Sequence, residues 1–173
     1  MNKLKATVSV AFNILNCVAI LYTMYNPSLA IAYAEKWALS FNPKYYNFTN
    51  IGGDCTNFVS QCLHFGNIPM NYNQYGWFYI SLYNRAPAWT GVNEFWNFGT
   101  KNTGLGLKLT PCSAQDLLVG DIIQLFNGDR YYHNLLVTSL DNGIRVSAHD
   151  YKAFNTLLSN YNYKDLRCAH VSS

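Results

Sequence analysis

The sequence predicts an α+β domain in which helices come first and antiparallel strands follow. Three observations support this prediction. Apolar residues recur at helical spacing within residues 26–65, and short apolar runs separated by turn-forming residues occupy residues 121–149. The two kinds of element are segregated along the chain rather than alternating. With 173 residues, of which 50% are hydrophobic and 12% charged, the chain is suited to one packed domain, which we place at residues 25–173.

Residues 1–24 differ in composition from the rest. Lys3 and Lys5 precede an uncharged, largely apolar run from Ala6 to Met24, as in a secretory signal. Against this, Asn13 and Asn16 lie about one helical turn apart, and no clear Ala-x-Ala cleavage site follows. The segment is therefore either a signal peptide, a signal anchor or an N-terminal helix packed on the domain. Membrane contact is expected only through this segment, if it is an anchor.

Three helices are expected in the first 100 residues. The first opens at Asn26-Pro27, an N-cap residue followed by proline, and ends at Asn42-Pro43. The second runs from Cys55 to Phe65, directly after Gly52-Gly53, and a short third helix covers Thr90 to Phe98. In the second helix one stripe is expected to be buried, made of Cys55, Phe58, Val59, Cys62 and Phe65.

The remaining elements are strands. Apolar runs predict strands at Asp121–Phe126, Tyr131–Leu140, Ile144–His149 and Leu166–Val171. Turns rich in Asn, Asp and Gly separate the first three, which indicates an antiparallel meander.

The strongest local indication of chemistry is Cys55 at the start of a helix. The unpaired backbone N–H groups and the helix dipole favour an anion there, so we expect a lowered thiol pKa and a reactive thiolate. The N–H of Cys55 itself is a candidate oxyanion donor. The alternative is a structural cysteine, which is our interpretation of Cys62 on the same face.

A thiol nucleophile needs a base and a group that orients the base. His133 lies on the second predicted strand, and His149 ends the next strand, followed by Asp150. Across an antiparallel pair such residues can face one another, so His133 is the candidate base, and His149 or Asp150 is the candidate orienting residue. Consecutive strand residues face opposite sides, so only one of the two can point at His133. A half-buried strand histidine without catalytic function is the alternative for His133.

The composition limits the other classes of function. A formal net charge of +3 suits a weakly anionic partner such as a wall polymer, but it is too small to indicate nucleic-acid binding. The five cysteines have no regular spacing and no Cys-x-x-Cys pair, so neither a disulfide framework nor a zinc site is predicted. No cofactor or metal is expected, and the sequence does not indicate an oligomeric state.

Several blocks of the sequence resemble the bacterial putative amidase domain family, which is grouped with papain-like cysteine amidases and peptidases of the cell wall. The most specific block is Gly52-Gly-Asp-Cys-Thr-Asn-Phe-Val-Ser-Gln-Cys-Leu63. The resemblance begins near Tyr33-Ala-Glu-Lys-Trp-Ala-Leu and continues through Gly120-Asp-Ile-Ile-Gln124, Leu135-Leu-Val-Thr138 and Ala148-His149.

The resemblance implies a papain-like fold in which the cysteine helix packs on the sheet that carries the histidine. It implies Cys55 as nucleophile, His133 as base, and His149 or Asp150 as a third polar residue. The expected activity is cysteine-dependent hydrolysis of amide bonds in peptidoglycan or a related peptide, by a secreted or envelope-associated protein. Two alternatives are an inactive wall-binding module and an acyl or peptidyl transferase that uses the same pair.

Residues outside the cysteine–histidine pair are candidates for substrate contact. The aromatic segment 72–98 could line a groove that stacks on sugar rings, with Trp77 and Trp89 as its main members, or it could fill the core. Asp54 is the third substrate-binding candidate, and it could also hold the loop beside Cys55.

Overall fold

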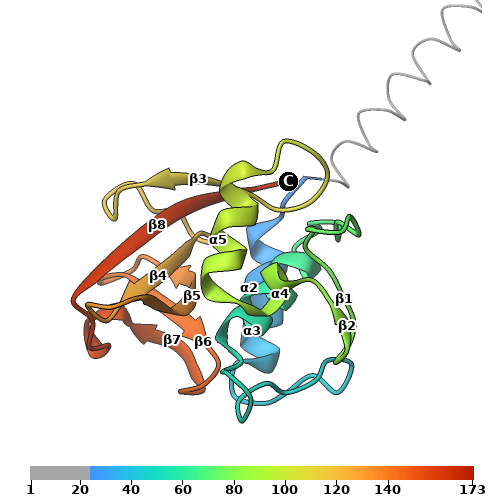
Figure 1. The fold of residues 1–173 in the computed structure, drawn as a ribbon. Helices are drawn as coiled ribbons and strands as arrows, with labels where there is room; N and C mark the ends of the chain where they lie inside the picture. The colour runs from blue at the N-terminus through green and yellow to red at the C-terminus, as the bar shows by residue number, and fades with distance from the viewer. Residues whose placement is uncertain (1–23) are drawn as a thin grey trace, which may run out of the picture.

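The computed structural model describes residues 24–173, so the interpretation of residues 1–24 as a signal peptide, an anchor or a packed helix lies outside the described residues except for Met24. The fold is α+β, as predicted, with helices gathered on one side of an antiparallel sheet (Figure 1). Among the described residues, none of the helices is long and apolar enough to span a membrane.

Two helices form the first part of the domain. Helix α2 (Pro27–Trp37) begins where predicted, because the Asn26 side chain accepts a hydrogen bond from the N–H of Leu29 and proline follows. It ends at Trp37, earlier than the expected Asn42-Pro43. Helix α3 (Cys55–Phe65) has the predicted bounds and ends at Gly66.

Burial along α3 is nearly complete. The predicted stripe is buried except for Phe65, which is 52% exposed. Polar residues on the other side of the helix are also buried, including Thr56, Asn57 and Ser60. This helix is therefore enclosed between other elements and does not lie on the surface with one polar face.

The middle of the chain is less regular. A short hairpin pairs β1 (Tyr79–Ser81) with β2 (Asn84–Arg85). Helix α4 (Pro87–Thr90) and helix α5 (Val92–Lys101) follow, where a single helix over Thr90–Phe98 was predicted. The difference arises at Gly91, whose extended backbone separates the two helices.

The main sheet has six strands in the order β3-β8-β4-β5-β6-β7. Strands β4 (Ile122–Phe126), β5 (Tyr131–Ser139) and β6 (Arg145–Ala148) form the predicted meander, and the predicted last strand is β8 (Asp165–Ser172). Two strands were not predicted, β3 (Lys108–Cys112) and β7 (Ala153–Leu157). A 3-10 turn, η1 (Leu158–Asn160), leads from β7 toward β8.

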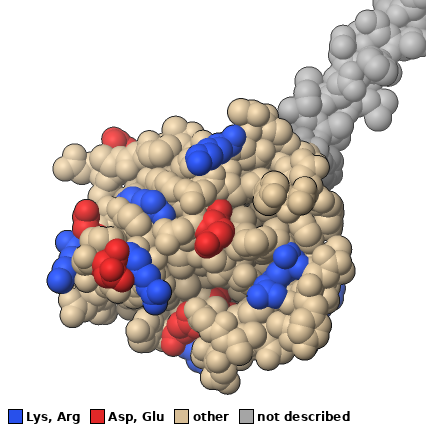
Figure 2. All heavy atoms as spheres, viewed as in Figure 1, with Lys and Arg blue, Asp and Glu red and all other residues tan. Residues whose placement is uncertain are grey.

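Two apolar clusters cover the two faces of this sheet. One joins the helices to the sheet through Ile122, Leu136 and Ala169, and the other contains Ile123, Leu135 and Leu158. Strand β5 contributes to both and also packs against α3, which places the start of α3 beside the middle of the sheet. On the face shown in Figure 2, Lys and Arg side chains are scattered among acidic ones and form no basic patch.

Candidate active site

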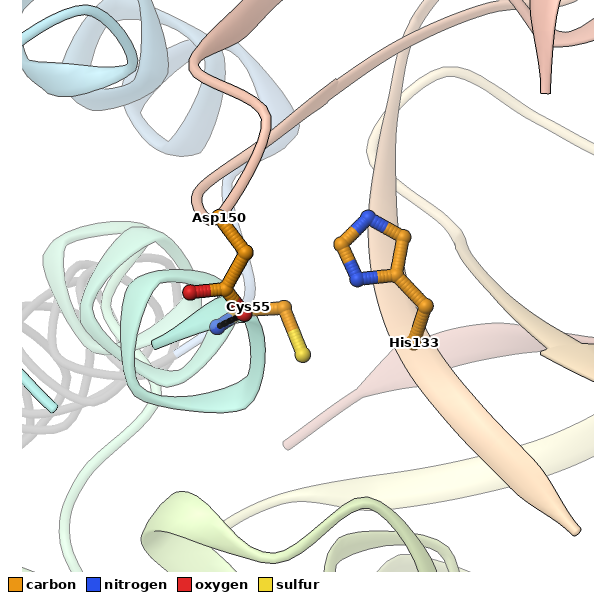
Figure 3. A group of neighbouring side chains, drawn as sticks. All are labelled: Cys55, His133 and Asp150. Atoms are coloured by element: carbon orange, nitrogen blue, oxygen red, sulfur yellow. Dashed lines mark hydrogen bonds between the residues drawn. The ribbon is translucent and has the colours of Figure 1, made fainter. Parts of the chain in front are cut away.

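The structure brings together Cys55 from the start of α3, His133 from β5 and Asp150 from the turn after β6 (Figure 3). The cysteine sulfur, a histidine ring nitrogen and a carboxylate oxygen of Asp150 all lie within 4.8 Å of one another. Nδ1 of His133, the ring nitrogen bonded to Cγ, is turned toward Cys55 and Asp150. The three residues are far apart in the sequence, so the tertiary fold assembles the cluster.

A hydrogen bond between the residues that follow Cys55 and His133 in the sequence joins α3 to β5. The amide Nδ2 of Asn134 donates to Oγ1 of Thr56 at 2.9 Å, and both side chains are buried. Thr56 follows Cys55 and Asn134 follows His133, so this bond fixes the helix start against the strand at the position of the pair. Neither residue was a candidate, because only the fold shows that their side chains meet.

Asp150 binds the N-terminus of α3. Its carboxylate accepts hydrogen bonds from the backbone N–H of Asp54, at 2.7 and 2.9 Å, and from that of Cys55, at 3.1 Å. A carboxylate at this position interacts favourably with the helix dipole. Gly53 makes the approach possible, since a Cβ atom there would lie 2.8 Å from the carboxylate oxygen Oδ2.

This contact changes two expectations about Asp150 and Cys55. The Cys55 N–H, expected to be available for an oxyanion, already donates to Asp150. Asp150 is also not hydrogen-bonded to His133, although it lies beside Nδ1. Of the two candidate orienting residues, Asp150 is the one the structure places at the pair.

His149 lies elsewhere. Its Nδ1 is 2.5 Å from Oδ2 of Asp54, and its Nε2 is 2.9 Å from the carbonyl oxygen of Trp37. Both ring nitrogens are therefore occupied, so the alternative in which His149 orients His133 does not fit the structure. His149 and Asp150 both lie beyond the end of β6, in a turn where Asp150 has a left-handed backbone (φ 72°), and this turn directs the two side chains to different groups.

Asp54 holds the loop before α3. Its Oδ1 accepts hydrogen bonds from the backbone N–H of Phe48, at 2.7 Å, and from the Asn57 side chain, at 2.9 Å. Asp54 is 1% exposed, and all of these partners are protein groups. The loop-holding interpretation fits this arrangement, and a direct contact between Asp54 and substrate does not.

Trp77 and Trp89 are core residues. Both are fully buried, with ring centroids 4.8 Å apart. The indole N–H of Trp77 donates to Ser60, and that of Trp89 donates to Asn57, both on α3. The prediction that these rings line a sugar-binding groove is therefore wrong, and the core-filling alternative is correct. The two rings therefore pack against α3 as part of the apolar core.

The electrostatic environment favours neutral forms of both Cys55 and His133. Burial raises the pKa of the Cys55 thiol to about 12; the Asn134 backbone N–H opposes the shift and the Asp150 charge adds to it. Burial lowers the pKa of His133 to about 4, and the Asp150 charge opposes that change. The expected lowering of the thiol pKa is thus wrong, because loss of water outweighs the helix dipole.

Three tyrosine rings surround His133. Tyr132 is stacked beside it with ring centroids 5.9 Å apart, Tyr151 approaches edge-on at 5.6 Å, and Tyr161 is tilted at 5.9 Å. The same three rings line an open pocket of about 420 Å³, together with Asn160 and Asn162 among others. None of these residues was predicted as part of the site, because their proximity to His133 arises only from the fold.

Two groups of side chains have donor atoms that suit a metal. The Cys55, His133 and Asp150 cluster offers sulfur, nitrogen and oxygen ligands of the kinds that zinc accepts. A second cluster consists of Cys112, Asp121 and His170. There the Asp121 carboxylate already accepts hydrogen bonds from two backbone N–H groups and lies 2.7 Å from the His170 ring, which fits a structural role.

Comparison with known proteins identifies the family. The model of the family described as "Putative amidase domain" matches residues 24–171. Among curated proteins of Bacillus subtilis (strain 168), the chain is 34% identical to uncharacterized protein YhbB over 127 residues, which is 66% of this chain and 37% of YhbB. It is 30% identical to uncharacterized protein YjcM over 132 residues, which is 73% of this chain and 29% of YjcM. The chain thus spans about a third of the length of these relatives.

No solved structure matches the chain. The family match extends from α2 to β8 and includes Cys55, His133 and Asp150. A family described as an amidase domain indicates hydrolysis of amide bonds. On this evidence the chain belongs to the putative amidase domain family.

Proposed function

We propose that this protein is a cysteine amidase or peptidase that cleaves amide bonds in peptidoglycan or a related peptide. The observation that carries the proposal is the thiol–imidazole pair, with the Cys55 sulfur within 4.8 Å of a His133 ring nitrogen. The family indicates amide hydrolysis, and this pair supplies both a nucleophile and a base. We further propose a papain-like arrangement, since the cysteine starts a helix that packs on the strand bearing the histidine.

The reaction begins from the neutral pair. Because the pKa of Cys55 is raised and that of His133 is lowered, proton transfer accompanies attack and does not precede it. The Cys55 sulfur bonds to the amide carbon while Nδ1 of His133 takes the thiol proton. The imidazolium then gives this proton to the leaving amine as the carbon–nitrogen bond breaks, which leaves a thioester. Water, deprotonated by His133, attacks the thioester and releases the acid and the free thiol.

Asp150 has two effects in this scheme. Its negative charge stabilises the imidazolium that forms on His133, consistent with its upward effect on the pKa of that residue. Its carboxylate also occupies the N–H of Cys55. In this arrangement the Cys55 N–H is therefore not open to an oxyanion.

The pocket beside His133 supports the substrate class. Tyrosine rings offer faces for stacking, and the side chains of Asn160 and Asn162 offer amide hydrogen-bonding groups. Such a lining suits a peptide attached to sugar. We propose that a wall peptide enters here, and that the protein acts outside the cell or at the cell envelope.

The test compares two cysteines of one helix. Cys55→Ala is expected to abolish release of new amine from purified peptidoglycan and to remove iodoacetamide labelling at position 55, with the fold retained. Cys62→Ala is the matched control, because Cys62 is fully buried on the same face without a histidine partner. Full activity in Cys55→Ala would refute the proposal.

The same assay separates the two alternatives. Wild-type protein that binds wall material without releasing amine would indicate a binding module. Product formed only when an amine acceptor is supplied would indicate a transferase.

A further inference from the structure

Three buried side-chain atoms in the described part of the chain have no hydrogen-bond partner: Nε2 of His133, Oδ1 of Asn134 and the hydroxyl oxygen of Tyr161. Buried polar groups are normally paired, because an unpaired one loses its hydration without compensation. Two of the three belong to neighbouring rings, His133 and Tyr161, whose centroids are 5.9 Å apart. They adjoin the active site proposed above.

The proposed reaction determines which kind of hydrogen-bond partner Nε2 of His133 requires. Nδ1 faces Cys55 and must accept the thiol proton, so the neutral ring carries its hydrogen on Nε2. A buried Nε2–H requires an acceptor, and an acceptor also fixes the tautomer and the orientation of the ring. A free Nε2 would let the hydrogen move to Nδ1, where it would block the base.

The other polar groups near His133 are used elsewhere. Asp150 lies on the Nδ1 side and binds the start of α3. Both nitrogens of His149 have partners. The hydroxyl of Tyr132 donates to the carbonyl oxygen of Asn162 at 3.0 Å. Oδ1 of Asn134 is also unpaired, but His133 and Asn134 are consecutive residues of β5 and face opposite sides of the sheet. The Tyr161 hydroxyl is left, and burial raises its pKa to about 12, which keeps the phenol neutral.

We propose that Tyr161 is the positioning residue of His133: its hydroxyl accepts the Nε2–H hydrogen bond, either after a small ring rotation or through one water. The inference rests on the proposed function for the identity of the base. The separation of the two rings suits such a contact, since catalytic hydrogen bonds are often long in the absence of substrate and shorten when it binds. Tyr161 follows the η1 turn, and its ring also lines the pocket beside His133, so bound substrate would press on it.

The experiment uses Tyr161→Phe, which removes one oxygen and keeps the ring. Tyr132→Phe is the matched control, because that ring also packs beside His133 while its hydroxyl bonds to the backbone. The first readout is the ¹⁵N spectrum of the histidine rings, with the His133 signals assigned from a His133→Gln variant. We expect the Nε2–H tautomer in the wild type and in Tyr132→Phe, and a mixture of tautomers in Tyr161→Phe.

The second readout is amide hydrolysis. We expect kcat to fall about tenfold in Tyr161→Phe with KM little changed, because the lost hydrogen bond is needed as charge develops on the ring. Tyr163→Phe is the activity control and should keep its kcat, because Tyr163 packs against the same apolar cluster as Tyr161 but does not line the pocket.

Identical His133 spectra in the wild type and Tyr161→Phe would overturn the proposal, as would an Nδ1–H tautomer in the wild type. The second result needs no variant, so it decides the matter even if Tyr161→Phe does not fold. If the proposed function itself is wrong, neither the wild type nor any variant will hydrolyse amides. The spectra would still show whether Tyr161 fixes the tautomer of His133, so the two failures can be told apart.

Discussion

Two histidine–aspartate neighbours near the start of α3, His149 with Asp54 and His133 with Asp150, are built in opposite ways. His149 and Asp54 form a closed network in which each polar atom of both side chains has a partner. His133 lies beside Asp150 without a hydrogen bond to it, and its Nε2 has no partner at all. Both histidines are almost fully buried, at 1% and 2% exposure, so burial does not distinguish them.

The closed pair leaves neither ring nitrogen free. Nδ1 of His149 is bonded to the Asp54 carboxylate and Nε2 to the Trp37 carbonyl oxygen. At the other site, burial keeps His133 neutral. The complete hydrogen bonding of His149 fits a structural role, and the incomplete hydrogen bonding of His133 fits the change of protonation that we propose for it.

Removing Asp54 should have the largest effect on stability. Asp54→Ala leaves Nδ1 of the buried His149 ring and the N–H of Phe48 without their partner, and we expect the free energy of unfolding to fall by about 3–5 kcal/mol. Urea denaturation of the variant and the wild type measures this. Asp129→Ala, at an exposed turn, is the control. A loss below about 1 kcal/mol, the range of exposed pairs, would contradict the buried contact between Asp54 and His149.

Acid should destabilise the protein through His133. Its pKa is lowered in the folded state to about 4 from an ordinary value of 6.5, so the unfolded chain binds the proton more readily between these pH values. Stability is full above pH 6.5 and is lost as the pH falls toward 4. We expect roughly 2 kcal/mol of loss between about pH 6.5 and about pH 5 from this residue.

Urea midpoints at the two pH values, compared with those of His133→Gln, isolate this contribution. Glutamine does not titrate in this range, so the variant should lose correspondingly less stability on acidification. Equal losses in the two proteins would show that His133 is not held neutral by burial.

Asp150→Asn should have a smaller effect on stability than Asp54→Ala, about 1 kcal/mol or less, because the amide oxygen can still accept from the start of α3. The removed charge opposes ionisation of Cys55, so labelling of Cys55 by iodoacetamide should become severalfold faster. Mass spectrometry of labelled peptides over time measures this rate. Slower labelling with an intact fold would mean that Asp150 assists ionisation of the thiol.

Removal of metal ions by a chelator should have no effect on amide hydrolysis. Cys55 and His133 provide the nucleophile and the base of the proposed reaction, so incubation with EDTA or phenanthroline should leave amide hydrolysis unchanged. Loss of activity that added zinc restores would instead indicate a metal bound by Cys55, His133 and Asp150.

Local patterns predicted much of the fold. Helix α3 and strands β4, β5 and β6 were found because apolar spacing, flanking glycines and Asn-Gly turns act over a few residues. Strand β3 was missed because it contains Pro111, which pairs with Ala169 of β8. Its pairing with β8 depends on a partner far along the chain.

The candidate site was predicted less completely. Cys55 was predicted because it lies at the start of a helix, and His133 was predicted because it is a polar residue on an apolar strand. The choice between His149 and Asp150 depends on the backbone of the turn after β6, and the pKa of Cys55 depends on tertiary burial, so neither follows from local sequence. The error over Trp77 and Trp89 has a similar cause, since an aromatic run has the same composition in a groove and in a core.

The bond between Thr56 and Asn134 spans 78 positions, the same separation as between Cys55 and His133. Contacts of such long range form only after the entropy of closing a large loop has been overcome. We therefore expect the environment that shields the thiol to form late, when the helix docks on the sheet. During refolding, the loss of rapid alkylation at Cys55 would show when α3 docks on the sheet, so the rate of Cys55 alkylation reports on this late step of folding.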